Sequence, residues 1–298
     1  MFYSNWMSYI KDEAKINKIA IPGSHNSATM GMSKFGKCQN DSLFEQYRYG
    51  VRFFDIRVKA DKKGRLFIAH GIMKGLPARL AFESLGMILE QSDEFFILNI
   101  KTYMNQKIGP ISLSYSGNSE AMNALIREYL CPEKYALTGY GDISELTLGD
   151  VRKSGKKYII TNANKEYDFS NDCPVIDPWD SSIYGYKPEK FANEVVNFLR
   201  TNDTDGIFWF QTQQTPNFGT ENGWTKWPDD LEKMSRPYFS GIIAEIAADK
   251  KLVEKVNVIA GDFMTADYMK ANDILSLNLL KGIVKDELVE EYKKNIGK

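Results

Sequence analysis

Short runs of β-branched and aromatic residues alternate along this chain with longer segments in which apolar residues recur at helical spacing. Alternation of that kind is typical of parallel strand–helix units. The short runs predict eight strands, over residues 18–21, 51–58, 66–70, 95–101, 158–161, 174–176, 206–211 and 256–262. The longer segments predict helices over residues 80–91, 119–129, 188–201, 229–250 and 266–281.

Eight strands with helices between them favour an α/β protein built as a single, irregular TIM-type (β/α)8 barrel. Residues 60–65, between the second and third strands, are too few for a helix, so we expect these two strands to form a hairpin or a tight turn. No Pro/Ser-rich linker, charge run or fixed-period repeat divides the chain. One barrel domain over residues 1–298 is therefore the simplest interpretation.

Composition excludes several classes of protein. With 298 residues, 43% of them apolar and 26% charged, the chain can bury a large core, so it is not a disordered protein. Thirty-eight Lys and Arg residues against 39 Asp and Glu give a net charge of -1, so no overall basic field attracts nucleic acid. The apolar runs are far shorter than the roughly 20 residues that cross a bilayer, and no membrane span is predicted.

The cysteines and the N-terminus bear on the cellular compartment. Cys38, Cys131 and Cys173 have no CxxC spacing, which predicts neither a disulfide framework nor a zinc cluster, and we interpret them as buried or incidental thiols. The segment from Met1 to Trp6 lacks the basic and apolar regions of a signal peptide. We therefore expect a cytoplasmic protein, or a secreted one if a leader has been removed.

The chain has only two histidines, and each lies at the end of a predicted strand. A lone histidine is more often structural, but the carboxyl ends of barrel strands are where the chemistry of such a fold is concentrated. His25 lies in a Gly/Ser/Asn-rich turn whose backbone can bring a side chain against a ligand, and His70 closes the strand over 66–70. The pair predicts a functional site that contains both rings.

Between the histidines, residues 52–57 read Arg-Phe-Phe-Asp-Ile-Arg. Strand alternation puts Phe53, Asp55 and Arg57 on one face. A barrel interior accommodates Asp55 and Arg57 only if partners or a bound anion satisfy their charges. The segment is therefore a structural ion pair at the barrel mouth or part of an anion-binding site, and the flanking histidines favour the second interpretation.

Two imidazoles and a guanidinium suffice for phosphoryl transfer. One histidine removes a proton from a hydroxyl, the arginine neutralises phosphate charge, and the other histidine protonates the leaving oxygen. A metal-assisted enzyme usually shows a cluster of carboxylates, and this region offers only Asp55. Without a metal to activate water, an internal hydroxyl of the substrate is the expected nucleophile and a cyclic phosphate the expected first product.

Three segments resemble the X-domain signature of bacterial phosphatidylinositol-specific phospholipase C (PI-PLC): residues 21–29 (IPGSHNSAT), 52–57 (RFFDIR) and 69–71 (AHG). Weaker similarity continues at residues 98–101, 148–152 and 258–263. The resemblance implies a TIM-barrel lyase that needs no metal cofactor and cleaves phosphatidylinositol to diacylglycerol and inositol 1,2-cyclic phosphate. Its partner would be phosphatidylinositol in membranes or micelles, with transient contact to the membrane surface and none to nucleic acid.

The resemblance also implies roles for individual residues. His25 would be the general base on the inositol 2-hydroxyl, and His70 the general acid toward the diacylglycerol oxygen. Arg57 matches the arginine that takes the place of the calcium site of eukaryotic relatives, and Asp262 matches the carboxylate that orients the base. The residues expected around the substrate are Asn26, Asp55, Lys101, Asp180 and Tyr184.

The sequence departs from the bacterial pattern in two places. Asn26 stands where bacterial enzymes have aspartate, as in calcium-dependent relatives whose asparagine helps to hold the metal. Arg57 still disfavours calcium, because a cation and a guanidinium do not share one position. Residues 162–164 are Asn-Ala-Asn where the family offers an arginine to the sugar, and Asp180 is followed by two serines, with Tyr184 nearby, where the family has Asp-x-Tyr. A different head group therefore stays open.

A segment rich in aromatics follows the strand over 206–211. Residues 216–227 include Phe218, Trp224 and Trp227, and residues 30–37 add Met, Phe and Lys. We expect these side chains either to touch a lipid surface as a membrane rim or to pack over the barrel end. Two rival functions also stay open: a related phosphodiesterase for another glycerophospholipid or a glycosyl-phosphatidylinositol anchor, and a head-group-binding module without turnover.

Overall fold

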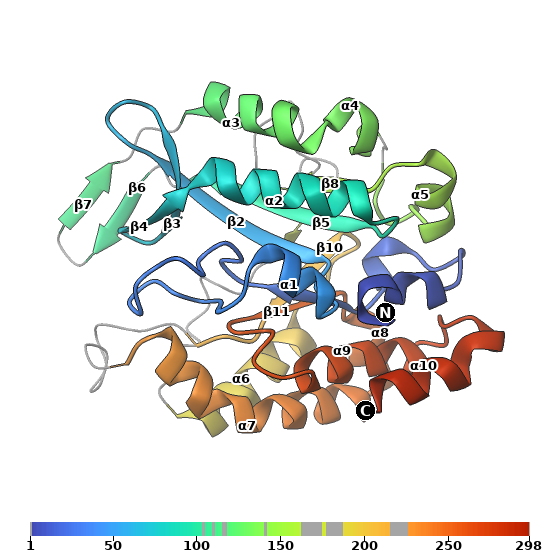
Figure 1. Ribbon diagram of the computed structural model, residues 1–298. Coiled ribbons are helices and arrows are strands. Elements are labelled where there is room, and N and C mark those ends of the chain that lie inside the picture. Colours follow the sequence, from blue (N-terminus) through green and yellow to red (C-terminus); the bar gives the residue numbers. More distant parts are fainter. Residues whose placement is uncertain are drawn as a thin grey trace.

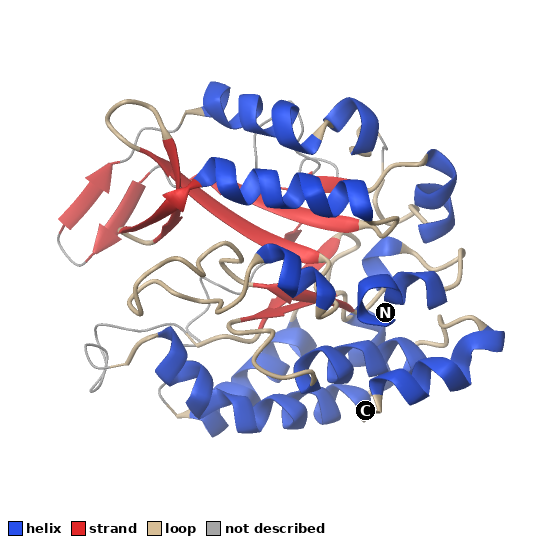
Figure 2. Ribbon diagram, viewed as in Figure 1, coloured by secondary structure: helices blue, strands red, loops and turns tan. Residues whose placement is uncertain are grey.

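A computed structural model describes residues 2–102, 105–108, 111–114, 118–139, 142–161, 175–176, 187–214 and 226–297. Over these ranges a curled sheet runs through the molecule, with one group of helices on each side of it (Figures 1 and 2). The helices are α1 (Leu43–Arg48), α2 (Ala78–Gln91), α3 (Ser119–Leu125), α4 (Pro132–Tyr135), α5 (Leu148–Ser154), α6 (Pro188–Thr201), α7 (Pro228–Ala247), α8 (Lys250–Lys255), α9 (Met269–Leu280) and α10 (Val289–Ile296). Figure 1 shows α2 and α3 on one side of the sheet and α7, α9 and α10 on the other.

The strands form one large sheet and one small hairpin. They are β1 (Ile21–Ser24), β2 (Phe53–Ala60), β3 (Leu66–His70), β4 (Met73–Pro77), β5 (Phe96–Thr102), β6 (Asn105–Ile108), β7 (Ile111–Ser114), β8 (Tyr158–Thr161), β9 (Val175–Ile176), β10 (Ile207–Gln211) and β11 (Val258–Gly261). Parallel pairings run in the order β8, β5, β2, β1, β11, β10, β9. This is the curled parallel sheet of an irregular barrel, so the predicted fold class is confirmed.

The third predicted strand is not a barrel strand. β3 pairs antiparallel with the far end of β2, with Ala60 opposite Leu66 and Val58 opposite Ile68, and then turns into β4. The hairpin expected from the short segment 60–65 is therefore present. The return direction matters for the site. Because β3 runs back along β2, continuing the pairing for two residues past Ile68 places His70 beside the middle of β2.

Other differences lie at the ends of elements. The first strand begins at Ile21 rather than at Lys18, because a 3-10 turn occupies Ile16–Lys18 and pairing with β11 starts at Ile21. The helix expected over 229–250 is divided, because the Asp249 side chain accepts a hydrogen bond from the Lys251 amide and begins α8 there. The pattern over 119–129 is α3 followed by a π-helical turn at Ile126–Leu130.

Alternate strand residues fill the inside of the curled sheet in layers. The innermost layer is apolar and includes Phe53 and Trp209, whose ring centroids lie 4.9 Å apart. Gly23 lies opposite Phe53 in the β1–β2 pairing, and a Cβ atom there would stand 3.0 Å from both Phe53 and Ala260, a close approach that favours glycine. The inward positions two residues further along the strands are polar and buried: Asp55, Asn99, Thr161 and Gln211. An apolar core thus supports a polar floor at the carboxyl ends of the strands.

Within the described ranges, no helix has the combination of length and apolar character that a bilayer span requires.

Candidate active site

The carboxyl ends of three neighbouring strands carry most of the predicted catalytic residues. His25 directly follows β1, Arg57 lies in β2, and Asp262 directly follows β11. Parallel pairing of β1 with both β2 and β11 brings these ends together, and each of the three side chains is at most 4% exposed. His70, from the end of the returning strand β3, completes the group. The structure therefore unites the four residues that the sequence singles out.

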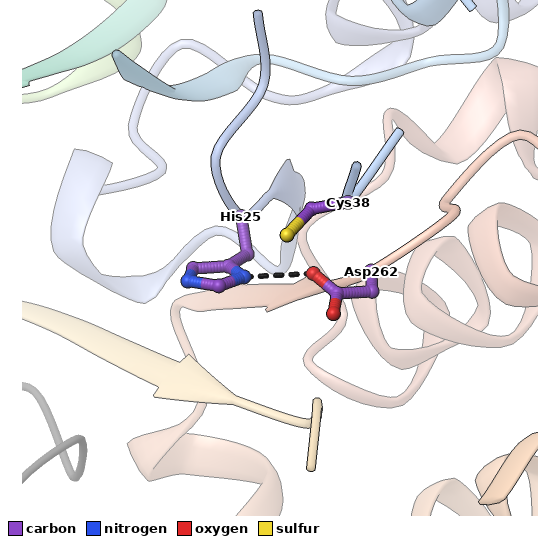
Figure 3. Close-up of side chains that lie close together, drawn as sticks. All are labelled: His25, Cys38 and Asp262. Carbon is purple, nitrogen blue, oxygen red and sulfur yellow. Dashed lines mark hydrogen bonds and ion pairs between the residues drawn. The ribbon is translucent and has the colours of Figure 1, made fainter. Parts of the chain in front are cut away.

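His25 and Asp262 form a buried pair. Nδ1 of His25 lies 2.7 Å from Oδ1 of Asp262 (Figure 3). Since a carboxylate only accepts hydrogen bonds, this contact assigns the proton to Nδ1 and leaves Nε2 as an acceptor. Nε2 indeed receives a hydrogen bond from the Asn26 side-chain amide at 2.9 Å. The ring is thus held in the tautomer that a general base needs.

His70 stands close to His25. The two ring centroids lie 5.9 Å apart with the planes at 87°. Nδ1 of His70 donates to the carbonyl oxygen of Gly36 at 3.0 Å. Burial, followed by the neighbouring charges of His25 and Arg57, lowers the pKa of His70 from 6.5 to about 3. The ring is therefore neutral near pH 7 before any anion enters the site.

Arg57 is fixed by Asp55. The guanidinium Nε donates to Oδ2 of Asp55 at 2.8 Å, and the backbone amide of Asn26 donates to the same oxygen at 3.0 Å. Burial alone would favour the protonated acid, but Arg57 and then His25 outweigh it and lower the pKa of Asp55 below its usual value. The ion pair foreseen for this strand exists, and it holds the guanidinium beside both histidines.

Asn99 is a site residue that the sequence reasoning missed. Its side-chain amide donates to Oδ1 of Asp55 at 2.7 Å, and Thr161 donates to its carbonyl oxygen at 3.2 Å. In the β2–β5 pairing Asn99 lies directly opposite Asp55. The signal was present, because the same alternation that turns Asp55 inward applies to the strand at Asn99.

The hydrogen bonds by which the segment between His25 and α1 closes over the site were also missed. Thr29 Oγ1 donates to the Asn26 carbonyl at 2.8 Å and accepts from the Cys38 amide at 2.9 Å. Gln39 Nε2 donates to the His25 carbonyl at 2.9 Å and to the Gly261 carbonyl at 3.0 Å. These bonds fold residues 26–39 over the ends of β1 and β11.

Cys38 is buried, as expected, but it lies inside the site. Its sulfur is 3.5 Å from Nδ1 of His70 and 3.7 Å from Nδ2 of Asn26. Burial, followed by the charge of Asp262, raises the pKa of the Cys38 thiol well above its usual value. The thiol is therefore neutral and is a poor nucleophile.

The remaining predicted residues divide into two groups. Lys101 lies opposite Arg57 in the β2–β5 pairing, so it shares the face of the sheet that carries the site. Trp227 is half-buried and packs edge-on against Phe35, with centroids 4.4 Å apart at 81°. The others lie outside the described residues: Asp180, Tyr184, Phe218 and Trp224.

Sequence similarity to known proteins is limited to short segments. No family model matches the chain. Over 74 residues the chain is 36% identical to the 1-phosphatidylinositol phosphodiesterase of Staphylococcus aureus (strain Newman), which covers 23% of this chain and 24% of the relative. Over 96 residues it is 32% identical to a PI-PLC X domain-containing protein of Dictyostelium discoideum, which covers 24% of this chain and 17% of the relative. The aligned parts thus span about a quarter or less of these relatives.

Solved structures match along nearly the whole chain. The PI-PLC from Listeria monocytogenes has a TM-score of 0.65 at 17% sequence identity, covering 93% of this chain and 98% of that one. This chain has the fold of a bacterial PI-PLC. A PI-PLC from S. aureus with pentafluoro-Phe incorporated gives a TM-score of 0.66 at 17% identity, covering 92% of this chain and 97% of that one. The likeness predicted from three short segments is therefore confirmed at the level of the fold.

Proposed function

We propose that this chain cleaves the phosphodiester bond of phosphatidylinositol and releases diacylglycerol and inositol 1,2-cyclic phosphate. The observation that supports the proposal is the arrangement of the two histidine rings. Nδ1 of His25 lies 2.7 Å from Asp262, and the centroids of the His25 and His70 rings lie 5.9 Å apart in an edge-on contact. Rings this close can both contact one phosphodiester through hydrogen bonds of about 2.8 Å, His25 at the attacking hydroxyl and His70 at the leaving oxygen. The names of the relatives, 1-phosphatidylinositol phosphodiesterase and PI-PLC, support the same reaction class.

In the first half of the reaction, His25 acts as the general base. Nε2 removes the proton of the inositol 2-hydroxyl while that oxygen forms a bond to phosphorus. Asp262 stabilises the imidazolium that results, because its carboxylate already holds Nδ1–H. The Asn26 amide, which donates to Nε2 in the ligand-free site, gives way to the substrate hydroxyl.

In the second half, Arg57 and His70 act on the phosphate. Arg57, oriented by Asp55, neutralises charge on the non-bridging oxygens. His70 donates a proton to the diacylglycerol oxygen as its bond to phosphorus breaks. Because the pKa of His70 is about 3 without substrate, the bound phosphodiester anion must supply the negative charge that raises it. Substrate binding and proton uptake by His70 are therefore coupled.

We propose that the reaction uses no metal ion. Both carboxylate oxygens of Asp55 already accept hydrogen bonds from protein groups, Oδ2 from Asn26 and Arg57 and Oδ1 from Asn99. Calcium prefers about six to eight oxygen ligands, and to bind Asp55 it would have to compete with Asn99 at Oδ1 or with Arg57 and Asn26 at Oδ2. Arg57 supplies the positive charge that a metal would supply elsewhere.

The substrate is proposed to be presented by a membrane. Phe35 is 46% exposed beside Trp227, and Met30 is 41% exposed, so the edge of the site offers apolar side chains to a lipid surface. Lys101, which lies opposite Arg57 in the β2–β5 pairing, is proposed to donate to a sugar hydroxyl. Cleavage of another glycerophospholipid or a glycosyl-phosphatidylinositol anchor, and binding without turnover, are the alternatives.

Phosphorus NMR of the reaction tests the proposal. Vesicles of phosphatidylinositol should give the resonance of a five-membered cyclic phosphate, while vesicles of choline or ethanolamine lipid should give no product. If no product of any kind forms from phosphatidylinositol, the alternative of binding without turnover would be favoured. Equal turnover of the choline lipid would show a different head-group preference.

A further inference from the structure

The thiol of Cys38 belongs to a compact group of metal-ligating side chains. A ring nitrogen of His25, the sulfur of Cys38 and a carboxylate oxygen of Asp262 all lie within 4.8 Å of one another. Figure 3 shows the sulfur directed toward the contact between His25 and Asp262. The three residues come from three separate parts of the chain, and each is at most 4% exposed. The reaction proposed above uses His25 and Asp262 but gives the thiol no part.

A second observation concerns the Asn26 side chain, whose amide contacts two members of the group. Among the described residues, Oδ1 of Asn26 is a buried oxygen with no hydrogen-bond partner, although the residue is only 1% exposed. The amide nitrogen of the same side chain contacts both His25 Nε2, at 2.9 Å, and Cys38 Sγ, at 3.7 Å. A buried acceptor without a donor is costly, and a bound cation is one way to satisfy it.

We propose that His25, Cys38 and Asp262 form an inhibitory binding site for a soft divalent cation, with Zn²⁺ as the physiological type. One sulfur, one imidazole nitrogen and one carboxylate oxygen are a donor set that zinc accepts in tetrahedral geometry, with the fourth position left for water or the Asn26 oxygen. Calcium and magnesium prefer oxygen ligands only, so neither should compete.

The charges and protons of the bound state balance. Zinc binding displaces one proton from the Cys38 thiol to solvent, because the thiolate is the ligand. When Nδ1 takes the metal, the ring proton of His25 moves to Nε2, and the Asn26 amide nitrogen that donates to Nε2 gives up that contact. The dipositive ion, the thiolate and the Asp262 carboxylate then sum to zero charge, which suits a buried position.

Inhibition follows from the same proton shift. In the zinc-bound form Nε2 of His25 carries a proton and no longer accepts one from the inositol hydroxyl. The inference about inhibition rests on the proposed function, whereas the inference about zinc binding does not. A binding measurement therefore separates failure of this proposal from failure of the proposed activity.

The experiment compares the unmodified chain with Cys38→Ser and with Cys131→Ser, whose thiol is exposed and lies outside the cluster. Competition against a chromophoric chelator should give one zinc ion per chain for the unmodified protein and for Cys131→Ser. Cys38→Ser should bind zinc at least about tenfold more weakly, since removal of a group that only orients a metal ligand already lowers metal affinity by about that factor. Cadmium should give a sulfur charge-transfer absorption band in the first two proteins and not in the third.

Activity on phosphatidylinositol, measured at buffered free zinc, should fall in the unmodified chain and in Cys131→Ser. The inhibition constant of Cys38→Ser should be higher by the same factor as its zinc affinity is lower. Equal zinc affinity in all three proteins would overturn the site, and zinc binding at Cys38 without inhibition would overturn the inhibitory role. If Cys38→Ser does not fold, the chain's two histidines decide by NMR: one equivalent of zinc must shift the His25 resonance of the unmodified protein.

Discussion

The side-chain amide of Asn26 donates a hydrogen bond to Nε2 of His25 over 2.9 Å. The contact occupies the nitrogen that removes a proton in the proposed reaction. Asn26 has a φ of 45°, in the left-handed region that asparagine and aspartate tolerate better than other side chains. An aspartate therefore fits the same backbone, and the effect of the amide can be tested separately from the fold.

Asn26→Asp should remove the hydrogen bond that the amide donates to Nε2 of His25, because a carboxylate only accepts hydrogen bonds. Proton NMR is well suited to the measurement, because the chain has only two histidines to assign. The ring resonances of His25 should move in the variant, while thermal unfolding checks that the variant is folded. Unchanged His25 resonances would mean that Asn26 does not contact the ring in solution.

Replacing either histidine by alanine should abolish most of the activity. Since general acid–base terms are worth at least about a hundredfold, His25→Ala and His70→Ala should each lower kcat on phosphatidylinositol by that factor or more. Thermal unfolding of each variant serves as the control for folding. Near-normal turnover in either folded variant would contradict the assignment.

Acid should destabilise the protein through His70. Its pKa is lowered from 6.5 to about 3 in the folded chain, so between these values the unfolded chain binds more protons at this position. The free energy of unfolding should fall as pH decreases through this window, by at most about 1.4 kcal/mol per pH unit. Above pH 6.5 His70 is neutral in both the folded and the unfolded chain, so its protonation no longer lowers the free energy of unfolding.

The variant His70→Asn should lack that dependence. Urea denaturation at about pH 7 and about pH 4 should show a smaller loss of stability in His70→Asn than in the unmodified chain. Cys131→Ser, whose side chain is exposed and distant from His70 in sequence, should lose as much as the unmodified chain. Equal losses in all three proteins would assign the acid sensitivity to other groups.

Removal of metal ions should leave the reaction rate unchanged. Arg57, held by Asp55 at 2.8 Å, supplies the positive charge in the proposed reaction, so EDTA should have nothing essential to remove. Rates measured in zinc-free buffer with and without EDTA, and with added calcium, check this. A strict calcium requirement would assign a catalytic role to Asn26 and Asp55 instead.

Trp227→Ala should weaken binding to lipid vesicles. The side chain packs edge-on against the exposed Phe35, with centroids 4.4 Å apart, so its loss removes apolar area and support from that edge. Vesicle sedimentation should detect the change, and turnover of a soluble inositol phosphodiester should be spared. Equal loss with both substrates would show that the ring only packs over the barrel end.

Strand alternation predicted part of the site, although of the polar floor it identified only Asp55. The inward positions of Asp55 and Arg57 follow from period-two spacing in one strand, and His25 follows from the turn after another. Their neighbours in the folded chain are set by parallel pairing, which brings β1 between β2 and β11. Local pattern and topology agree here, so a single sequence is informative.

The contributions of Cys38 and Gln39 could not be predicted in the same way. Cys38 lies 32 positions from His70, and Gln39 lies 222 positions from Gly261, to whose carbonyl it donates. No regular spacing connects such residues, because an irregular segment positions them by hydrogen bonds to Thr29 and to the backbone. Motif reasoning therefore finds residues on strands and misses those on the loop that closes over them.

The antiparallel return of β3 places one member of the acid–base pair outside the parallel strands of the barrel. His70 is carried by β3, which pairs with β2 and β4 and whose alignment depends on the turn after Ala60, while His25 is anchored to the central strands. A slip of one residue in that alignment would turn the imidazole to the opposite face, and a slip of two would slide it along the mouth by about 7 Å. Evolution can therefore change the span between proton donor and proton acceptor, and with it the size of ester that fits, by altering a surface turn alone.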